Sequence, residues 1–255
     1  MMFAISALEG CAVNASDGEV GTVKDILFDD EAWRIRWVVV DTGTWLTGRK
    51  VLIHPSAIEP LDLEPQPRLP MMGAVREITL SVRLTKRQIE ASPPVGENSP
   101  LSQQVESQLY EFYGWDQAWG ASYFGGVAIA PLSTPSSVAP GATDQDHNLR
   151  SVEMVNRAHV HATDGDIGHV ENLLADDVNW DIRYLIVATR NWWFGKHVLL
   201  SPYAVVKVGW SDGEVYLNVT RDQVKSSPPW DPMKAIERID EERLHRHYGW
   251  RGYGW

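Results

Sequence analysis

The stretch that decides the fold is DGEVGTVKDILFDDEAWRIRWVVVDTGTWLTGRKVLIHP, residues 17–55. It recurs as DGDIGHVENLLADDVNWDIRYLIVATRNWWFGKHVLLSP at residues 164–202. Between residues 12–56 and 159–203, 19 of 45 aligned positions are identical, and the alignment needs no gap. Repetition over this length indicates that one structural unit occurs twice in the chain.

Beyond this core the two copies remain related, but the alignment shifts. Ser-Pro-Pro at 92–94 matches 227–229, and Tyr-Gly-Trp at 113–115 matches 248–250. We call the alignment of 12–56 with 159–203 the first register and this later alignment the second register. The first copy holds twelve additional residues around 61–73, where prolines predict a surface loop.

The repeat sets the predicted domain boundaries. The first domain spans residues 1–119 and the second spans residues 150–255. Between them, residues 120–149 are rich in Gly, Ala, Ser and Pro and show no periodicity, which is typical of a flexible linker or an extended strap.

Within each copy, turn residues separate short runs of β-branched and aromatic residues. Asp17-Gly18 and Asp164-Gly165 predict tight hairpins, and the paired acids at 29–30 and 176–177 predict second turns. Five or six short strands with these turns favour a closed barrel, because closure removes exposed edges. The prediction is a mainly β protein with two small antiparallel barrels in tandem. The strands it specifies include 33–40, 50–54 and 75–82 in the first copy, and 180–187, 196–200 and 214–219 in the second.

A helix is expected after each barrel. Thr85 and Thr220 are predicted N-caps of one-turn helices that end at the Pro-Pro pairs. Ser99 is predicted to cap a longer helix in the first copy, and Asp231 repeats that start in the second. Each longer helix needs a cover for its apolar face, which could be its own barrel, the other barrel or a second chain.

Composition narrows the possible functions. The chain has 255 residues and a formal net charge of −11, which disfavours broad binding to a nucleic-acid backbone. The single cysteine, Cys11, excludes a disulfide within the chain and a cysteine-only zinc site. No apolar run is long enough to span a membrane, and no signal peptide is recognisable. We therefore expect a cytoplasmic protein that does not insert into membranes.

Several of these motifs resemble the PRC-barrel domain, which is named after the cytoplasmic domain of the photosynthetic reaction-centre H subunit. The resemblance implies a small barrel that serves as a binding scaffold, and association with a photosynthetic or membrane complex follows from the resemblance alone. A related barrel occurs in a ribosome maturation factor. The matching motifs are Asp-Gly-x-x-Gly at 17–21 and 164–168, Gly-Arg-Lys at 48–50, Gly-Lys-His at 195–197, and Thr-x-x-Gln at 85–88 and 220–223.

No catalytic constellation is recognisable. The sequence lacks the Gly-x-Ser-x-Gly nucleophile elbow and the phosphate-binding Gly-x-x-x-x-Gly-Lys-(Ser/Thr) loop. We therefore expect a protein that is not an enzyme and uses no cofactor. An enzyme with a site between the two barrels is the third reading.

The alternative function is metal or small-ligand binding by histidines of the second copy. His159 and His161 would share one face of a strand, and His169 would follow across the hairpin. The first copy has Ala12, Asn14 and Thr22 at the matching positions, so the barrel itself does not need these histidines.

The aromatic residues suggest the main function. Trp and Tyr are enriched at interaction hot spots because they combine a large contact area with a polar group. The same rings could instead cover barrel ends or join the two copies. The leading hypothesis is a non-catalytic binding or assembly module, packed as a pseudo-dimer, that binds a protein partner or self-associates. The candidate contact residues are Trp45, Trp115, Trp119, Trp192, Trp193, Phe194, Tyr248, Trp250, Tyr253 and Trp255.

Overall fold

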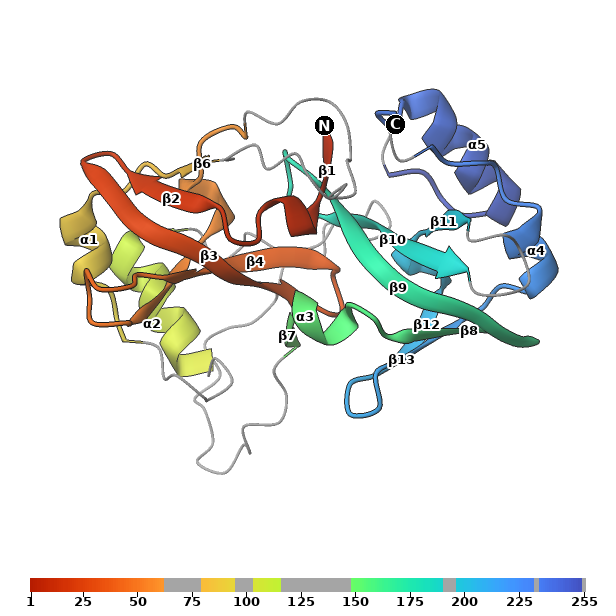
Figure 1. Cartoon of the computed structure of the whole chain (residues 1–255), viewed down its shortest axis with the longest axis horizontal. Coiled ribbons are helices and arrows are strands. Elements are labelled where there is room, and N and C mark those ends of the chain that lie inside the picture. Colours follow the sequence, from red (N-terminus) through yellow and green to blue (C-terminus); the bar gives the residue numbers. More distant parts are fainter. Residues whose placement is uncertain (62–78, 95–102, 116–147, 190–195, 232–233, 254–255) are drawn as a thin grey trace, which may run out of the picture. The chain divides into compact units, whose positions relative to one another are not determined.

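The computed structural model is mainly β, with two sheets (Figure 1). Two compact units hold the described residues. The first unit comprises those within Ala12–Glu59 and Thr79–Arg150, and the second comprises those within Met1–Cys11, 60–61 and Ser151–Trp255. The described residues are 1–61, 79–94, 103–115, 148–189, 196–231 and 234–253.

The first unit is built on a sheet with the strand order β5-β4-β3-β2-β6. A short 3-10 helix, η2 (Pro55–Ala57), follows β5, and two α-helices follow β6: α1 (Lys86–Glu90) and α2 (Gln103–Tyr113). The strands are β2 (Ala12–Ala15), β3 (Gly18–Asp29), β4 (Arg34–Asp41), β5 (Lys50–Ile53) and β6 (Thr79–Ser81).

The second unit repeats this arrangement and adds one strand, so that its order is β11-β10-β9-β8-β13-β12. The 3-10 helix η3 (Pro202–Ala204) joins β11 to β12, and α4 (Arg221–Lys225) and α5 (Arg238–Tyr248) follow β13. The strands are β8 (His159–Ala162), β9 (Gly165–Asp176), β10 (Ile182–Thr189), β11 (His197–Leu200), β12 (Val205–Gly209) and β13 (Glu214–Leu217).

The expectation of purely antiparallel sheets is wrong at one strand pair in each unit. β2 pairs with β6 in parallel, as β8 does with β13, whereas the other pairs along each sheet path are antiparallel. The chain reverses direction between β2 and β3, β3 and β4, and β4 and β5. A further reversal before β6 makes the fifth strand run like the first, so the pair that they form must be parallel.

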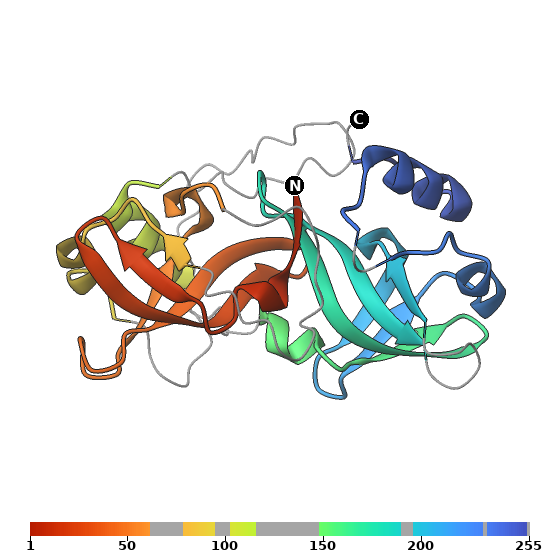
Figure 2. The ribbon, with the colours of Figure 1, turned by 45° about the horizontal axis from the view of Figure 1, so that its top comes forward.

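The first strand of each copy pairs with the long strand of the other copy. β1 (Met2–Ala4) lies antiparallel to β9, with Phe3 opposite Ala175 (Figure 2). When the first register is extended to the start of the chain, the equivalent of β1 is β7 (Leu149–Ser151), which pairs with β3. Short helical segments follow both strands: η1 (Ile5–Ala7) and α3 (Val152–Val155). Met1–Cys11 therefore belongs to the second compact unit, although in sequence it precedes the first copy of the repeat.

Matching backbone hydrogen bonds hold the two exchanged strands. The Asp177 N–H donates to the Met1 carbonyl at 3.0 Å, and the Asp30 N–H donates to the Asn148 carbonyl at 2.7 Å. Both the donors and the acceptors are equivalent in the extended first register, so the exchange is reciprocal. The side chains differ, because Phe3 of β1 packs edge-on against Trp180 whereas Arg150 of β7 pairs with Asp30.

The Asp-Gly-x-x-Gly motif has a geometric cause. The first glycine is in the left-handed region, with φ of 141° at Gly18 and 139° at Gly165. At the second glycine the backbones cross closely: a Cβ would lie 2.0 Å from the Asp41 carbonyl oxygen at Gly21 and 1.9 Å from that of Ala188 at Gly168. A side chain at Gly21 would therefore push β3 and β4 apart, and one at Gly168 would push β9 and β10 apart.

The predicted one-turn helices are confirmed. Thr85 and Thr220 each cap a helix and form a capping box with the glutamine three residues later. The Asp17 carboxylate accepts from the Lys86 N–H at 2.7 Å, so the hairpin turn also caps α1. The longer second helix starts later than predicted: α5 begins at Arg238 rather than after Asp231. The predicted start at Ser99 lies outside the described residues.

Candidate functional site

A buried polar cluster holds α5 to the sheet of the second unit. The Tyr184 hydroxyl, from β10, lies 2.9 Å from Glu241 Oε1 and 2.9 Å from His245 Nε2. All three residues are buried, with exposed fractions of 0%, 8% and 3% respectively. We call Tyr184, Glu241 and His245 the second-unit triad.

An arginine lies beside the second-unit triad. The Arg183 guanidinium lies 3.8 Å from the ring centroid of Tyr253, and its nitrogens lie 3.8 Å from carboxylate oxygens of Asp176 and Glu241. The Tyr253 hydroxyl donates to the Arg183 carbonyl at 2.7 Å and lies 2.6 Å from Ser201 Oγ. The residues after α5 are therefore also bound to β10.

The first unit holds α2 in an equivalent way. Trp37 Nε1 donates to Glu106 Oε1 at 3.0 Å, and Arg36 Nη2 donates to the same oxygen at 3.1 Å. Arg36 also donates to the Tyr110 hydroxyl at 2.9 Å. Trp37 matches Tyr184 in the first register, and Glu106 and Tyr110 match Glu241 and His245 in the second register. A glutamate thus docks the helix in both units, but the donors around it differ.

Burial changes the protonation of these groups. It raises the pKa of Glu241, an effect that the hydrogen bond with Tyr184 and the charge of Arg183 only partly oppose, and it lowers the pKa of His245. In the first unit, burial and then the charge of Arg36 lower the pKa of His54 to about 3. His54 lies among Trp37, Tyr110 and Trp115, with ring centroids 5.3 to 5.4 Å away.

The structure places four of the predicted contact aromatics against their own units. Trp115 stacks on Tyr113, and Trp250 stacks on Tyr248, both with centroids 4.1 Å apart. These stacks and Tyr253 pack against buried residues of the sheets and helices. Intramolecular packing therefore uses much of the surface of Trp115, Tyr248, Trp250 and Tyr253, and their contact with a partner stays a prediction.

The other predicted contact residues lie in or near loops. Trp45 is half-buried and its ring faces Lys86 Nζ, 4.4 Å from the centroid. The remaining candidates lie outside the described residues: Trp119, Trp192, Trp193, Phe194 and Trp255.

The predicted histidine cluster is only partly assembled. His159 and His169 are register partners across the β8–β9 pair. His161 Nδ1 lies 2.7 Å from Asp166 and its Nε2 lies 3.7 Å from Glu214, while its ring stacks on Tyr216. Among the residues that the structure describes, no group of three or more His, Cys, Asp or Glu side chains is placed to hold a metal ion.

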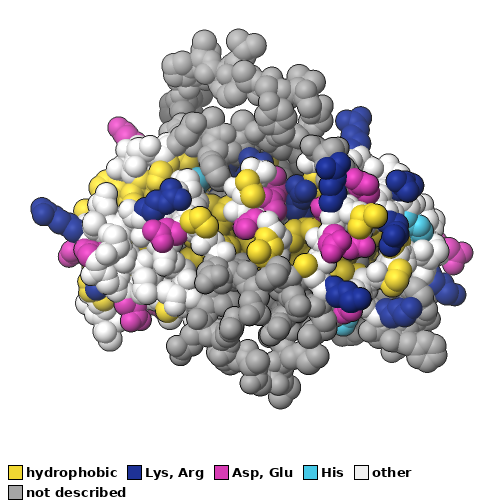
Figure 3. Space-filling model, turned by 90° about the horizontal axis from the view of Figure 1, so that it is seen from above, with side chains coloured by type: hydrophobic (Ala, Val, Ile, Leu, Met, Phe, Trp, Pro, Cys, Tyr) yellow, Lys and Arg dark blue, Asp and Glu magenta, His cyan; other side chains and the backbone are white. Residues whose placement is uncertain are grey.

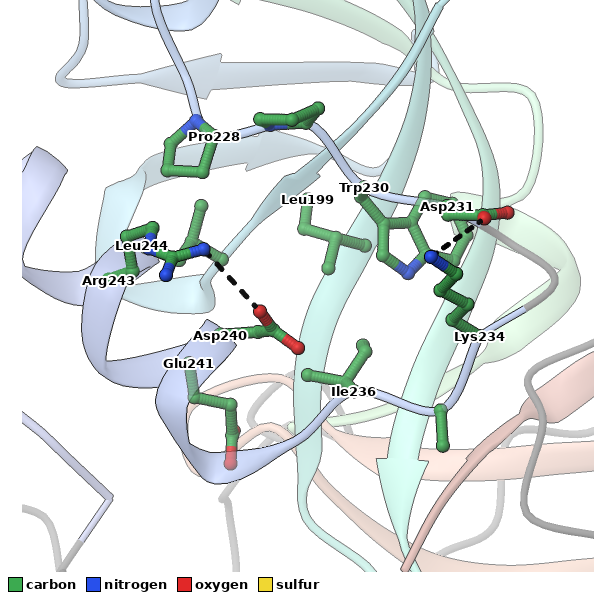
Figure 4. A pocket seen from close by; sticks show the side chains of 12 residues that line it. Leu199, Pro228, Trp230, Asp231, Lys234, Ile236, Asp240, Glu241, Arg243 and Leu244 are labelled. Atoms are coloured by element: carbon green, nitrogen blue, oxygen red, sulfur yellow. Dashed lines mark ion pairs between the residues drawn. The ribbon is translucent and has the colours of Figure 1, made fainter.

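A cavity of about 300 Å³ lies beside α5 in the second unit (Figure 4). Leu199, Trp230, Ile236 and Leu244 give it an apolar lining. Figure 4 shows two ion pairs among its polar lining residues, Lys234 with Asp231 at 4.0 Å and Arg243 with Asp240 at 3.8 Å. The cavity is at the small end of the range for ligand pockets.

Charged side chains are mixed on the surface. On the face shown in Figure 3, basic and acidic side chains alternate among the described residues. The described residues of that face therefore do not form a single-sign basic field of the kind that binds a phosphate backbone. No helix in the described part of the chain is long and apolar enough to cross a membrane.

Comparison with known families identifies the first copy. Residues 1–62 match the family model of the PRC-barrel domain. The chain therefore contains a PRC-barrel domain. No curated protein matches the chain. The PRC-barrel match begins at the exchanged strand β1 and runs through η2, so it includes a strand that the structure places in the second unit.

The sequence reasoning missed the glutamates that dock the helices. Glu106 and Glu241 match in the second register, as the Tyr-Gly-Trp motifs do, so the signal was available. A repeated acid within an apolar helix face indicates a buried partner, whereas a surface acid need not be repeated.

Proposed function

We propose that the chain is a non-catalytic binding or assembly module made of two PRC-type barrels that pack as a pseudo-dimer. The PRC-barrel match at residues 1–62 supports the identity of the first barrel. The identities shared with residues 159–203 and the repeated strand order support the second.

Closure of each barrel is part of the proposal. β11 pairs with β10, and β12 pairs with β13, while η3 joins β11 to β12 without a long loop. In the first unit Ile58, just after η2, forms a bridge with Val82 beyond β6. These pairings support one bent strand that joins the two ends of each sheet.

The observation that carries the pseudo-dimer is the reciprocal exchange of β1 and β7. Each copy's long strand pairs with the first strand of the other copy. Exchange of identical elements is a common route to symmetric dimers. Here the two exchanging copies belong to one chain, which makes the pair permanent.

The lack of catalysis is supported by how the buried polar side chains are used. In the first unit the Glu106 carboxylate is bound by Trp37 and Arg36. In the second unit the second-unit triad and Arg183 contact one another around α5. Glu241 and His245, whose pKa values burial shifts, therefore hold a helix in place, which is a structural use of such groups.

We assign the partner surface to the loop between the two middle strands of each copy, at Trp45 and its repeat equivalent Trp192. The proposed partner is a protein, because Trp is enriched at the hot spots of protein interfaces. The assignment of Trp192 rests on the repeat in sequence.

The test is affinity purification from the native cell with quantitative mass spectrometry. Wild-type chain is compared with W45A/W192A and with the control T44A/N191A, which alters the adjacent residue of each loop. A protein retained by wild type and control, and reduced at least tenfold by W45A/W192A, supports the proposal. Equal recovery with all three chains, or no enriched protein, contradicts it.

A further inference from the structure

The second-unit triad contains too few hydrogens if Glu241 is ionised and His245 is neutral. His245 Nδ1 is hydrogen-bonded to the Arg251 carbonyl, which can only accept. Nδ1 therefore carries the ring hydrogen of a neutral imidazole, and Nε2 is left as an acceptor. Tyr184 has a single hydroxyl hydrogen, yet its oxygen lies 2.9 Å from both Nε2 and Glu241 Oε1.

One hydrogen cannot serve two acceptors at once. With an ionised Glu241, either the carboxylate or His245 Nε2 would face the Tyr184 oxygen without a hydrogen between them. A buried acceptor left in this way has lost its hydrogen bonds to water and gains none from the protein, which destabilises the fold. A second proton removes the conflict, because the Tyr184 oxygen can accept one hydrogen bond while its hydrogen makes another.

We propose that Glu241 is protonated in the folded protein, donates to the Tyr184 oxygen, and thereby lets Tyr184 donate to His245 Nε2. The second-unit triad then has both hydrogen bonds satisfied, and the carboxyl group, the hydroxyl and the imidazole are all neutral. The result is a proton-dependent contact that holds α5 against β10. This device goes beyond the proposed binding function and does not depend on the identity of a partner.

The charged groups near Glu241 have opposing effects on its ionisation. Arg183 favours ionised Glu241, whereas Asp176 disfavours it, and burial favours the neutral carboxyl. Burial is the largest effect, so the pKa of Glu241 is raised. The titratable and charged groups that surround the second-unit triad are Asp176, Arg183, Tyr203, Arg251, Tyr253 and the N-terminal ammonium of Met1.

The sign of the pH dependence follows. Because the pKa of Glu241 is raised, its contribution to stability is fully present below the ordinary value of 4.5 and is lost as pH rises through the raised value. Because the pKa of His245 is lowered, its contribution is present above the ordinary value of 6.5 and is lost as pH falls towards the lowered value. Rising pH therefore weakens α5 through Glu241 alone.

The first unit provides a matched control. Trp37 and Arg36 each supply an N–H to Glu106, and neither needs an added proton. An ionised carboxylate is satisfied there, with a charged partner at 3.1 Å. Replacing the glutamate by glutamine should therefore destabilise the first unit and leave the second unit unchanged.

The experiment compares E241Q with E106Q in the full chain. A glutamine at position 241 keeps a permanent donor towards Tyr184, so we expect an unchanged thermal midpoint near neutral pH. At position 106 the glutamine loses the ion pair with Arg36, so we expect a midpoint lowered by several degrees. Hydrogen-exchange rates are measured for the amides of α5 and of α2 at each pH. The ratio of the α5 rate to the α2 rate should rise with pH in wild type and stay constant in E241Q.

A direct measurement completes the test. The chain is labelled with carboxyl ¹³C glutamate and ¹⁵N histidine, and NMR follows Glu241 and His245 between about pH 4 and pH 9. We expect Glu241 to titrate above the glutamate reference value and His245 to stay in the Nδ1–H form at neutral pH. An ordinary glutamate titration, an imidazolium at neutral pH, or equal destabilisation by E241Q and E106Q would overturn the proposal.

Discussion

Removing the aromatic ring of Phe3 is the sharpest perturbation of the strand exchange. Phe3 is 3% exposed, lies in β1, and packs its ring 5.5 Å from that of Trp180 in the second unit. Replacing a buried Phe by Ala costs about 3–5 kcal/mol, which includes the lost transfer energy and the cavity left behind. A large part of the stability of the second unit therefore depends on a residue from the start of the first copy.

The repeat offers a matched control for this change. Arg150 occupies the position equivalent to Phe3 and makes an ion pair with Asp30 at 3.0 Å, with the Arg150 side chain 31% exposed. A pair this exposed contributes at most about 1 kcal/mol. F3A should therefore cost several times more than R150A, although both change an exchanged strand.

Urea unfolding followed by tryptophan fluorescence, combined with hydrogen exchange of β9, measures both effects. We expect F3A to lower the free energy of unfolding by about 3–5 kcal/mol and to deprotect the β9 amides. R150A should leave β9 unchanged. If F3A costs less than about 1 kcal/mol, or if β9 keeps its protection, β1 does not complete the second unit.

Two further predictions concern single residues of the first unit. G21A should destabilise the first unit by several kcal/mol, because the added Cβ would lie 2.0 Å from the Asp41 carbonyl oxygen; denaturant titration would refute this with a loss below about 1 kcal/mol. The lowered pKa of His54, about 3, predicts that stability present above pH 6.5 is lost on acidification, by about 3 kcal/mol at pH 4. Unfolding measured from pH 7 to pH 4 should show this loss in wild type and a smaller loss in H54S, which carries the residue found at Ser201; identical curves would refute the assignment.

Local sequence features predicted the elements that depend on local chemistry. Thr85 and Thr220 cap helices as expected, since a hydroxyl and a glutamine three residues later form a capping box within the first turn of the helix. The paired acids also form turns as expected: Asp29 accepts from Glu31 and Ala32 N–H groups. These features are decided within a few residues.

The exchange could not be predicted in this way. β1 and β7 are three residues long, so they carry no periodicity. Each of these short strands could pair with the long strand of its own copy or with that of the other copy, because β3 and β9 are similar in sequence. Tertiary contacts such as that of Phe3 with Trp180 decide which pairing forms. β12 was missed for a related reason, since only Val205–Gly209 separates η3 from the next turn.

The candidate site was predicted only in part. The aromatic residues after the helices were recognised, but a sequence pattern does not show which side of a ring is covered. Their stacking on Tyr113 and Tyr248 joins residues two apart in sequence, whereas their packing against the sheets is a tertiary contact that only the structure shows. The glutamates that dock the helices were visible as a repeat, and only the structure shows that one is bound by Trp37 and the other by Tyr184.

The most direct test of the central claim is to cut the chain between its copies. A protease site is inserted within residues 120–147, the chain is cleaved under native conditions, and the product is examined by size-exclusion chromatography. Because each half holds a strand of the other, the halves should elute together at the position of the uncut chain, and F3A, which weakens one of the two exchanged strands, should make them dissociate at a higher protein concentration. Separation of the wild-type halves after cleavage would contradict the reciprocal exchange.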